Sequence, residues 1–312
     1  MKSVIGIDIG GTITKIGLVS EKAVCIKKTS FRTKEFNDFL SYIDKIHSSI
    51  NEIIDDKTKI LGIGIGAPNA SKNGTIETPA NLNWKGNLNL VESLRNKIDI
   101  PIFLSNDANC AAIGEMIYGN AKDLKDFIVI TLGTGLGSGI VSNGKIIEGY
   151  DGFAAELGHF SIKNNGRLTG LDIKGGLESY VSATGIKRTI MYMLSKYMND
   201  SIFRKVAFND LHGEDITKAA ENNDFIALKA YEYTGKILGE ALANFVTFSQ
   251  PEAIILTGGL AHSGKWILNP TKKTFEKNLL PFYKGKVKIL LSGLEDKDSA
   301  ILGSAALVWK NI

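Results

Sequence analysis

The sequence has few cysteines, few prolines and no long hydrophobic run, and each shortage excludes a class of protein. Its 312 residues include two cysteines, Cys25 and Cys110, too few for the disulfide framework of a secreted protein or for a zinc site made of cysteines alone. No apolar run approaches the ~20 residues that a membrane-spanning helix needs. Asp8 interrupts the apolar N-terminal stretch and no small-residue cleavage site follows, which argues against a signal peptide. We therefore expect a cytoplasmic protein that is soluble, with no membrane partner.

The charge is nearly balanced, and this argues against nucleic acid as a partner. Thirty-seven Lys and Arg oppose 33 Asp and Glu, leaving a formal charge of +4, whereas a nucleic-acid-binding protein concentrates basic residues on one face or in one run. Hydrophobic residues make up 44% and charged residues 22%, values typical of a folded globular chain. Glycine is abundant, at 33 residues, which favours tight turns where the backbone approaches a ligand.

Segments with strand and helix patterns alternate along the chain, which predicts a mostly parallel sheet covered by helices on both faces. The pattern restarts at residues 127–132, where a strand, a glycine-rich turn and a second strand follow the same plan as residues 3–19. This restart predicts two halves of similar design that meet near residues 120–125. The other strands are expected at residues 60–65, 102–104, 253–256 and 287–291, the helices at 36–54, 91–95, 108–118, 177–199, 225–248 and 299–309, and a loop at 162–176.

Three glycine clusters follow predicted strands, at residues 8–12, 133–139 and 257–259. Glycine lets several backbone N–H groups converge on phosphate oxygens, and a neighbouring threonine adds a hydroxyl donor. One such cluster alone could be a plain hairpin turn, but three together favour nucleotide binding. Asp8 would repel a phosphate unless a cation lay between them, so it is a candidate for Mg²⁺ binding, the alternative being a strand-end carboxylate that accepts turn hydrogen bonds.

Two familiar nucleotide motifs fail in their context. Residues 259–265 fit most of a P-loop, but Trp266 stands where Ser or Thr must reach Mg²⁺, and Pro270 argues against a long helix there. Residues 62–67 match a dinucleotide-binding Gly-x-Gly-x-x-Ala pattern, but Pro68 follows at once and no helix opens.

Polar residues at two places offer acid–base or sugar-binding chemistry. Asn106 and Asp107 stand between a strand and a helix, where they could cap the helix or take a hydroxyl proton during phosphoryl transfer. Glu156, His159 and Glu178 flank the irregular loop. They could bind sugar hydroxyls through paired acceptors, or they could be a surface ion pair and a lone histidine.

Eight short motifs spread in order over essentially the whole chain resemble those of the ROK family (repressors, uncharacterised open reading frames and sugar kinases). They are Asp8-Ile-Gly-Gly-Thr12, Pro79-Ala-Asn-Leu82 with Trp84, Asn106-Asp107-Ala-Asn109, Gly114-Glu115, Leu132-Gly-Thr-Gly135, Glu156-Leu-Gly-His159, Gly175-Gly-Leu-Glu178 and Thr257-Gly-Gly259. The resemblance implies an α/β protein of the actin-like, ribonuclease H-like ATPase fold, with two lobes of mixed sheets flanked by helices and a cleft between them. We expect residues 1–120 and the closing helix 297–312 to form the smaller N-terminal lobe, and residues 121–296 the larger C-terminal lobe.

The resemblance also implies a role for each matching position. Asp107 matches the catalytic base that deprotonates the sugar hydroxyl for attack on the γ-phosphate of ATP. With it, the sugar-contacting positions are Asn81, Asn106, Glu156, His159 and Glu178. The first phosphate loop comprises Asp8, Gly10, Gly11, Thr12 and Lys15, with Asp8 reaching Mg²⁺ through water. The second phosphate loop comprises Gly133, Thr134 and Gly135, and the adenosine-side turn comprises Gly258 and Gly259.

One departure from the family pattern concerns a metal. Many members hold zinc with the histidine of Glu-x-Gly-His and three cysteines, but here the cysteine positions read Thr169, Leu171 and Gly176, and Asp172 replaces a glycine. We therefore expect no structural zinc, with ATP and Mg²⁺ as the cofactors.

The function expected from these residues is an ATP-dependent hexose kinase, first of all a glucokinase acting as a homodimer. A fructokinase, an N-acylhexosamine kinase or a catalytically weak sugar-binding sensor is the alternative. A repressor is disfavoured because Asp8 already belongs to the first phosphate loop and leaves no room for a DNA-binding domain before it. A protein-binding ATPase of the actin or chaperone type is disfavoured because the chain carries no large insertion.

Overall fold

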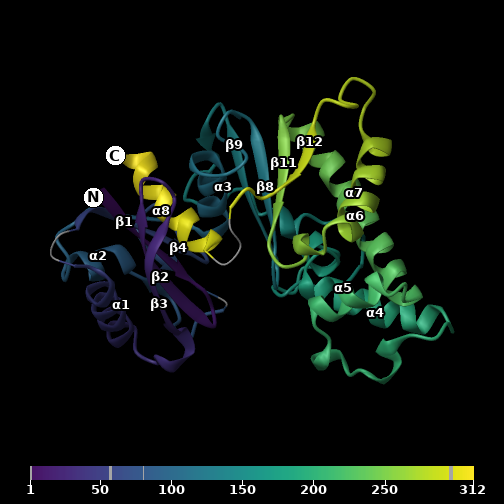
Figure 1. Ribbon diagram of the computed structural model, residues 1–312, viewed down its shortest axis with the longest axis horizontal. Coiled ribbons are helices and arrows are strands. Elements are labelled where there is room, and N and C mark those ends of the chain that lie inside the picture. The colour runs from purple at the N-terminus through teal and green to yellow at the C-terminus, as the bar shows by residue number, and fades with distance from the viewer. Residues whose placement is uncertain (1, 56–57, 80, 295–297) are drawn as a thin grey trace. The chain divides into compact units, whose positions relative to one another are not determined.

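The computed structural model describes residues 2–55, 58–79, 81–294 and 298–312 (Figure 1). Ala80 of the Pro79–Leu82 motif lies outside them. Two units pack internally: unit 1 comprises Met1–Lys125, Gly139–Ala155 and Ser292–Ile312, and unit 2 comprises Asp126–Ser138 and Glu156–Leu291. The lobe boundaries expected near residues 120 and 296 stay a prediction; the packing assigns residues 139–155 to unit 1.

The sheet of unit 1 is mixed and has the strand order β3-β2-β1-β4-β7. The strand β1 runs antiparallel to β2, which runs antiparallel to β3, whereas β4 lies parallel to β1 and β7 parallel to β4. The expectation of a mostly parallel sheet is therefore wrong here, because two tight turns fold the first three strands into a meander. The strands are β1 (Lys2–Ile9), β2 (Ile13–Ser20), β3 (Cys25–Arg32), β4 (Lys59–Ala67) and β7 (Ile102–Asn106).

Helices cover both faces of this sheet. On one face, Ile5 and Ile7 pack in a buried cluster with α1 (Phe39–Ile53) and α2 (Leu90–Arg95). On the other face, Val4 packs with α8 (Ser299–Asn311), which lies against β1 and β4 (Figure 1). The close approach of α8 requires glycine at Gly6 and Gly64, because a Cβ there would collide with the backbone oxygens of Ile301 and Ser304. The helix α3 (Asp107–Ile117) packs beside α8.

The second sheet repeats the strand order of the first. Its order is β10-β9-β8-β11-β12, in which β8 takes the place of β1, β9 that of β2, and β11 that of β4. As in the first sheet, the later strands run parallel, β11 to β8 and β12 to β11. The predicted restart of the design is thus confirmed. The strands are β8 (Phe127–Leu132), β9 (Leu136–Ser142), β10 (Lys145–Ile146), β11 (Ala253–Thr257) and β12 (Lys288–Leu291), and a two-stranded ribbon joins β5 (Ile76–Glu77) to β6 (Asn87–Leu88).

Two helices of unit 2 correct the sequence predictions. Pro270 lies inside α7 (Lys265–Asn278), although it was expected to prevent a long helix. The helix persists because it packs side by side with α6 (Phe225–Ser249), where a Cβ on Gly235 would lie 2.6 Å from the Pro270 ring (Figure 1). The helix predicted from residue 177 begins later, as α4 (Ala183–Lys196), where the Ser182 side chain accepts a hydrogen bond from Gly185 N.

The remaining helical segments are short. They are α5 (Gly213–Glu221) and 3₁₀ turns at Thr33–Glu35, Leu157–His159, Leu177–Ser179, Ile202–Lys205, Phe208–Asp210 and Ala261–Ser263. Within the described residues, we find no helix with the length and apolar character needed to cross a bilayer.

Candidate active site

Unit 1 brings together two of the predicted carboxylates, Asp8 and Asp107. Asp8 lies near the end of β1, opposite Lys15 of β2. Burial raises the pKa of Asp8 to about 6, and the nearby Asp107 charge adds to the rise while Lys15 opposes it. Two carboxyl groups that disfavour each other's ionisation concentrate negative charge, which a divalent cation would relieve. The position therefore fits Mg²⁺, which needs only one or two protein carboxylates because it keeps several waters.

The turn between β1 and β2 contains the first predicted phosphate loop. Gly10 N donates to Ile13 O at 3.1 Å, and Thr33 Oγ1 donates to Gly10 O at 2.8 Å, so the turn is a braced hairpin. A Cβ on Gly11 would lie 2.7 Å from the backbone oxygen of Asn81, which places this predicted sugar contact directly against the loop. The Thr12 side chain is exposed, so its hydroxyl is accessible to a ligand.

Asp107 is the first residue of α3, at the carboxyl end of β7. Asn106 caps this helix, since its Oδ1 accepts from Ala108 N at 2.8 Å, and Asp107 Oδ1 accepts from the same N–H at 2.8 Å. The capping alternative therefore holds for Asn106 and leaves the second Asp107 oxygen for other contacts. Although the Asp107 side chain reaches solvent, the protein atoms crowded around it raise the pKa of its carboxyl, and the Ala108 hydrogen bond offsets part of this rise.

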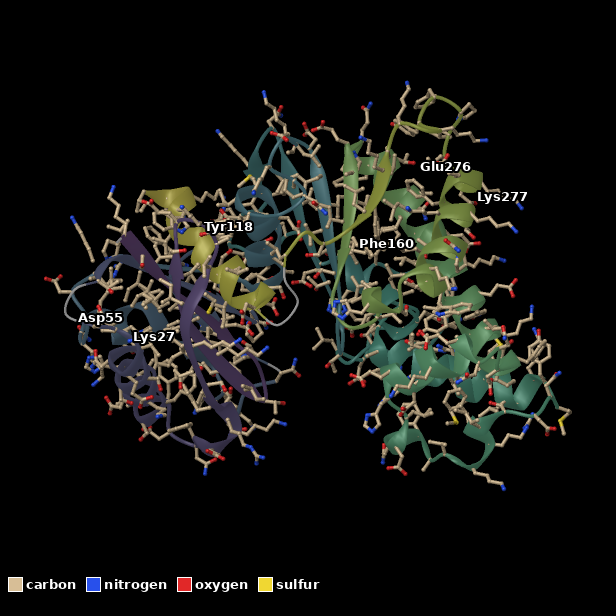
Figure 2. All side chains as sticks on the ribbon, viewed as in Figure 1. Lys27, Asp55, Tyr118, Phe160, Glu276 and Lys277 are labelled. Atoms are coloured by element: carbon tan, nitrogen blue, oxygen red, sulfur yellow. The ribbon has the colours of Figure 1, made fainter. Side chains whose placement is uncertain are left out.

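Unit 2 brings together the predicted sugar ligands Glu156 and His159. Glu156 Oε2 lies 3.9 Å from His159 Nε2. His159 Nδ1 is buried and has no hydrogen-bond partner among the described residues, which is the condition of a group that awaits a ligand. The turn that carries His159 is anchored by the next residue, Phe160, which Figure 2 labels. Its ring packs edge-to-face on Phe245 of α6 with centroids 5.7 Å apart.

Glu178 connects the irregular loop to the second predicted phosphate loop. Its Oε2 accepts from Leu136 N at 3.0 Å and its Oε1 accepts from Gly170 N at 3.3 Å. A Cβ on Gly135 would collide with the Glu178 carboxylate, so a larger residue there would push that carboxylate aside. Sequence reasoning assigned these residues to different ligands and did not predict their contact.

The start of α4 also holds the second phosphate loop. Ala183 N donates to Gly133 O at 2.8 Å, and Thr184 Oγ1 donates to Thr134 O at 3.2 Å. The third glycine turn follows β11, where Gly258 has a φ of +90°. A Cβ on Gly259 would meet nothing within 4 Å, so the backbone of this turn is open on that side.

The positions at which the family pattern holds zinc carry no metal ligands here. Thr169 Oγ1 instead accepts from the backbone N–H groups of Leu171 and Ile173, at 3.3 and 3.2 Å. Over the part of the chain that the structure describes, no group of three or more His, Cys, Asp or Glu side chains could hold a metal ion. These residues do not fit a structural zinc.

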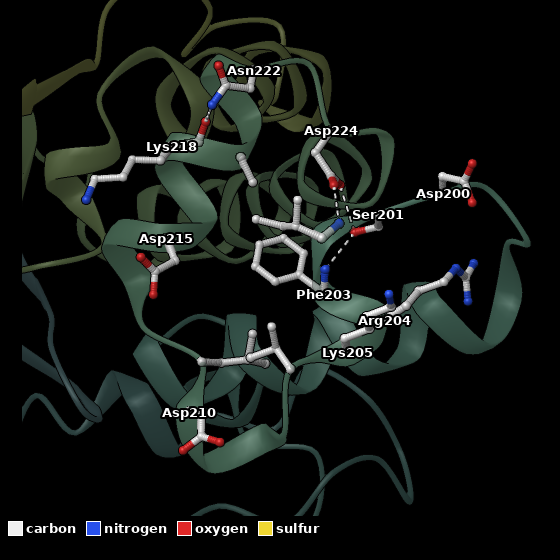
Figure 3. Close-up of a pocket in the computed structure, with 14 residues that line it drawn as sticks. Asp200, Ser201, Phe203, Arg204, Lys205, Asp210, Asp215, Lys218, Asn222 and Asp224 are labelled. Atoms are coloured by element: carbon white, nitrogen blue, oxygen red, sulfur yellow. Dashed lines mark hydrogen bonds between the residues drawn. The ribbon is translucent and has the colours of Figure 1, made fainter.

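A cavity with a volume of about 850 Å³ in unit 2 is lined by none of the predicted site residues (Figure 3). Its wall includes Asp224, whose carboxylate caps α6 by accepting from Ala227 N and also accepts from Ser201 Oγ and Ile202 N. Phe203, also in the wall, is buried. The Asp224 carboxylate in this cavity is therefore engaged in joining the start of α6 to the turn at residues 201–202.

The sequence and the fold of this chain are similar to those of known proteins. The model of the ROK family matches residues 4–311. A glucokinase of Thermotoga maritima is 30% identical over 311 residues, which cover 99% of this chain and 98% of that protein. A xylose repressor of Bacillus subtilis is 28% identical over 97% of this chain, which spans 76% of the repressor. Among solved structures, a ROK family glucokinase from Streptomyces griseus, in complex with glucose and AMPPNP, superimposes with a TM-score of 0.84 at 27% identity, covering 99% of each chain.

The match extends over the glycine turns, the Asn106–Asp107 pair and the loop before α4, and the architecture is the actin-like ATPase fold expected from the motifs. The chain therefore belongs to the ROK family.

Proposed function

We propose that this chain, a sugar kinase of the ROK family, transfers the γ-phosphate of ATP to a hydroxyl of glucose, with Asp107 as the catalytic base. The observation that carries the proposal is the Asp107 carboxyl at the start of α3, with its pKa raised and Asp8 beside it. A base is most effective when its pKa lies near the working pH, so a raised carboxyl pKa suits proton removal from an alcohol.

The reaction is an in-line displacement. As Asp107 takes the hydroxyl proton, the sugar oxygen forms a bond to the γ-phosphorus, and the bond from phosphorus to the β–γ bridging oxygen breaks with its electron pair on ADP. Mg²⁺, when bound, would neutralise the phosphate charge near Asp8. The backbone N–H groups of the glycine turns would orient the phosphates, because phosphoryl transfer depends mainly on positioning and electrostatics.

The sugar ligands in this proposal accept hydrogen bonds from sugar hydroxyls. Glu156 and Glu178 offer carboxylate oxygens, and the partly exposed imidazole of His159 offers a further hydrogen-bonding group. Glucose is the first choice because the glucokinases named above are relatives over the full chain. The alternatives within the family are a fructokinase and an N-acylhexosamine kinase. We also propose that the protein acts as a cytoplasmic homodimer, which light scattering after size-exclusion chromatography and cell fractionation would test.

The test is ADP release with MgATP and glucose, mannose, fructose, N-acetylglucosamine or N-acetylmannosamine, for the wild type, Asp107→Asn and the control Asp38→Asn. Asp38 is an exposed cap of α1, where Asn also caps well. We expect kcat with glucose to fall by roughly 10²- to 10⁴-fold in Asp107→Asn, the usual contribution of a general base, and to stay unchanged in Asp38→Asn. The Asp107→Asn protein should still bind glucose in calorimetry.

Three outcomes would contradict the proposal. Turnover retained in Asp107→Asn would show that another group is the base. Glucose binding without turnover in the wild type would instead identify a sugar sensor, and a higher kcat/KM with another sugar would replace glucose as the substrate.

A further inference from the structure

One arginine, which the motifs did not single out, ties the loop before Glu178 to the body of unit 2. Arg167 Nη1 donates to Thr189 Oγ1 at 3.0 Å and to Gly185 O at 3.2 Å, both on α4. The same nitrogen lies 3.5 Å from Ser179 O, and the guanidinium carbon lies 4.7 Å from the centroid of the Tyr180 ring. One side chain thus contacts the 3₁₀ turn at 177–179 and the first two turns of α4.

The backbone of Arg167 continues the same connection. Its N–H donates to Tyr180 Oη at 3.0 Å, and its carbonyl accepts from Gly175 N at 2.8 Å and from Ser179 Oγ at 3.2 Å. The side-chain acceptors are neutral oxygens, and burial lowers the pKa of Arg167 below its usual range. The flat guanidinium lies against the Tyr180 ring while its Nη1 donates to oxygens of α4, a combination that a lysine ammonium would not reproduce.

Arg167 is linked to Glu178 through residues on both sides of it. Ser179, the residue after Glu178, accepts from Arg167 Nη1 through its carbonyl and donates through its hydroxyl to the Arg167 carbonyl. Gly170, whose N–H holds Glu178 Oε1, lies three residues after Arg167 in the loop. The position of one carboxylate oxygen therefore depends on where Arg167 holds the loop.

We infer that Arg167 is a positioning residue that sets the Glu178 carboxylate for a sugar hydroxyl by holding residues 167–176 against α4. This inference rests on the proposed function, in which Glu178 contacts the sugar. The second phosphate loop has contacts that do not pass through Arg167 or Glu178, namely Ala183 N on Gly133 O and Thr184 Oγ1 on Thr134 O. Loss of Arg167 should consequently affect sugar binding more than ATP binding.

The test compares Arg167→Met with Arg204→Met. Arg204, labelled in Figure 3, is a matched control in the same unit. Its guanidinium also binds backbone carbonyls, Tyr197 O at 2.6 Å and Asn199 O at 2.7 Å. We expect Arg167→Met to raise the glucose KM about tenfold, with kcat and the ATP KM within about twofold, the pattern of a lost ground-state contact. Arg204→Met should leave all three constants unchanged.

Hydrogen exchange on the unliganded proteins provides a readout that needs no activity. Arg167→Met should speed exchange in residues 168–178 while peptides from α7 stay protected as in the wild type. If Arg167→Met does not fold, Thr189→Val removes one acceptor without changing side-chain volume and should shift the glucose KM and the exchange in the same direction by less.

Unchanged exchange in the loop of Arg167→Met would overturn the inference, even if the wild type has no kinase activity. A fall in kcat with equal rises in the glucose KM and the ATP KM would also overturn it, because it would indicate general destabilisation. The same changes in Arg204→Met would overturn it for the same reason. Faster loop exchange in Arg167→Met, together with no turnover in the wild type, would instead count against the proposed function and leave the positioning role supported.

Discussion

Replacing Asp8 by Asn should stabilise the free protein at neutral pH while it impairs catalysis. In the folded protein, burial and the Asp107 charge hold the pKa of Asp8 at about 6, against an ordinary value of 3.8. The ionised carboxylate is therefore less favourable in the folded chain than in the unfolded chain, and the neutral amide of Asn removes this cost. A site that binds Mg²⁺ and phosphate would explain why the sequence carries the destabilising residue.

The size of the effect follows from the pKa difference. A shift from 3.8 to about 6 is about two units, and each unit corresponds to 1.36 kcal/mol, so the cost reaches about 3 kcal/mol when Asp8 is fully ionised. Because the pKa of Asp8 is raised in the folded protein, ionisation of Asp8 lowers the free energy of unfolding. Below pH 3.8 the contribution of Asp8 to stability is fully present, and it is lost as the pH rises through 6. The advantage of Asp8→Asn should thus be absent near pH 4 and complete above pH 7.

The assay is urea unfolding of the wild type and Asp8→Asn at half-unit steps between pH 4 and pH 7.5. Asp38→Asn is the control with the opposite sign, because the Ser41 N–H lowers the pKa of Asp38. Stability from ionised Asp38 is present above its ordinary pKa and is lost as the pH falls through the lowered value. From pH 4 to pH 7.5 this contribution is fully present, so the difference between Asp38→Asn and the wild type should stay nearly constant.

Adding MgATP should reverse the order of stability. A divalent cation at Asp8 would favour the ionised form, so the ligand should raise the unfolding midpoint of the wild type more than that of Asp8→Asn. A constant difference between the two proteins from pH 4 to pH 7.5 would refute the reasoning, because the effect would then not come from ionisation. A midpoint shift with MgATP that is equal in both proteins would refute the cation role.

Two further predictions concern a buried carboxylate and a metal. Glu115 is 1% exposed and accepts hydrogen bonds from Ser292 Oγ and from the backbone N–H groups of Asn120 and Gly293. Since an amide nitrogen cannot accept, Glu115→Gln should lower the free energy of unfolding by about 1–3 kcal/mol, measured in urea; a change below about 0.5 kcal/mol would contradict this. Treatment with a zinc chelator, followed by restored Mg²⁺, should leave the glucose KM and thermal midpoint unchanged, because Thr169 offers no metal-ligating side chain; recovery by added zinc alone would contradict it.

The elements with strong periodicity could be predicted from the sequence, because their burial follows the pattern that revealed them. In α1, Ile43, Ile46 and Ile50 recur at helical spacing and all three are buried. The strand pairs at the start of each sheet were predictable for the same reason, as each couples an apolar strand to a glycine turn. In the edge strand β3, apolar and polar residues alternate weakly, because its side chains are all half-buried or exposed. Its pairing with β2 could therefore not be predicted from its own residues.

Tertiary packing overrode one local rule. Proline removes a helix hydrogen bond and was expected to stop the chain from forming a long helix at Pro270. In the structure, Gly235 and Gly239 on α6 leave room for α7 to pack closely over Pro270 and Thr271. The packing of two long helices outweighs the lost hydrogen bond, and it depends on residues about 35 positions apart.

Some residues of the candidate site could be predicted from their neighbours in the sequence, whereas others depend on contacts between distant residues. Asp8, Asp107 and the glycine turns could be predicted because each needs only its own strand end or helix start to be recognised. Arg167 could not, because it lies in a loop without periodicity and its partners, Tyr180 and Thr189, are joined to it only by the fold. The loop is ordered by backbone hydrogen bonds, such as Ile162 N to Gly175 O at 2.9 Å, and by side chains such as Arg167, whose shape and donors fit their partners. A sequence therefore reveals the groups that do chemistry before it reveals those that hold them in place.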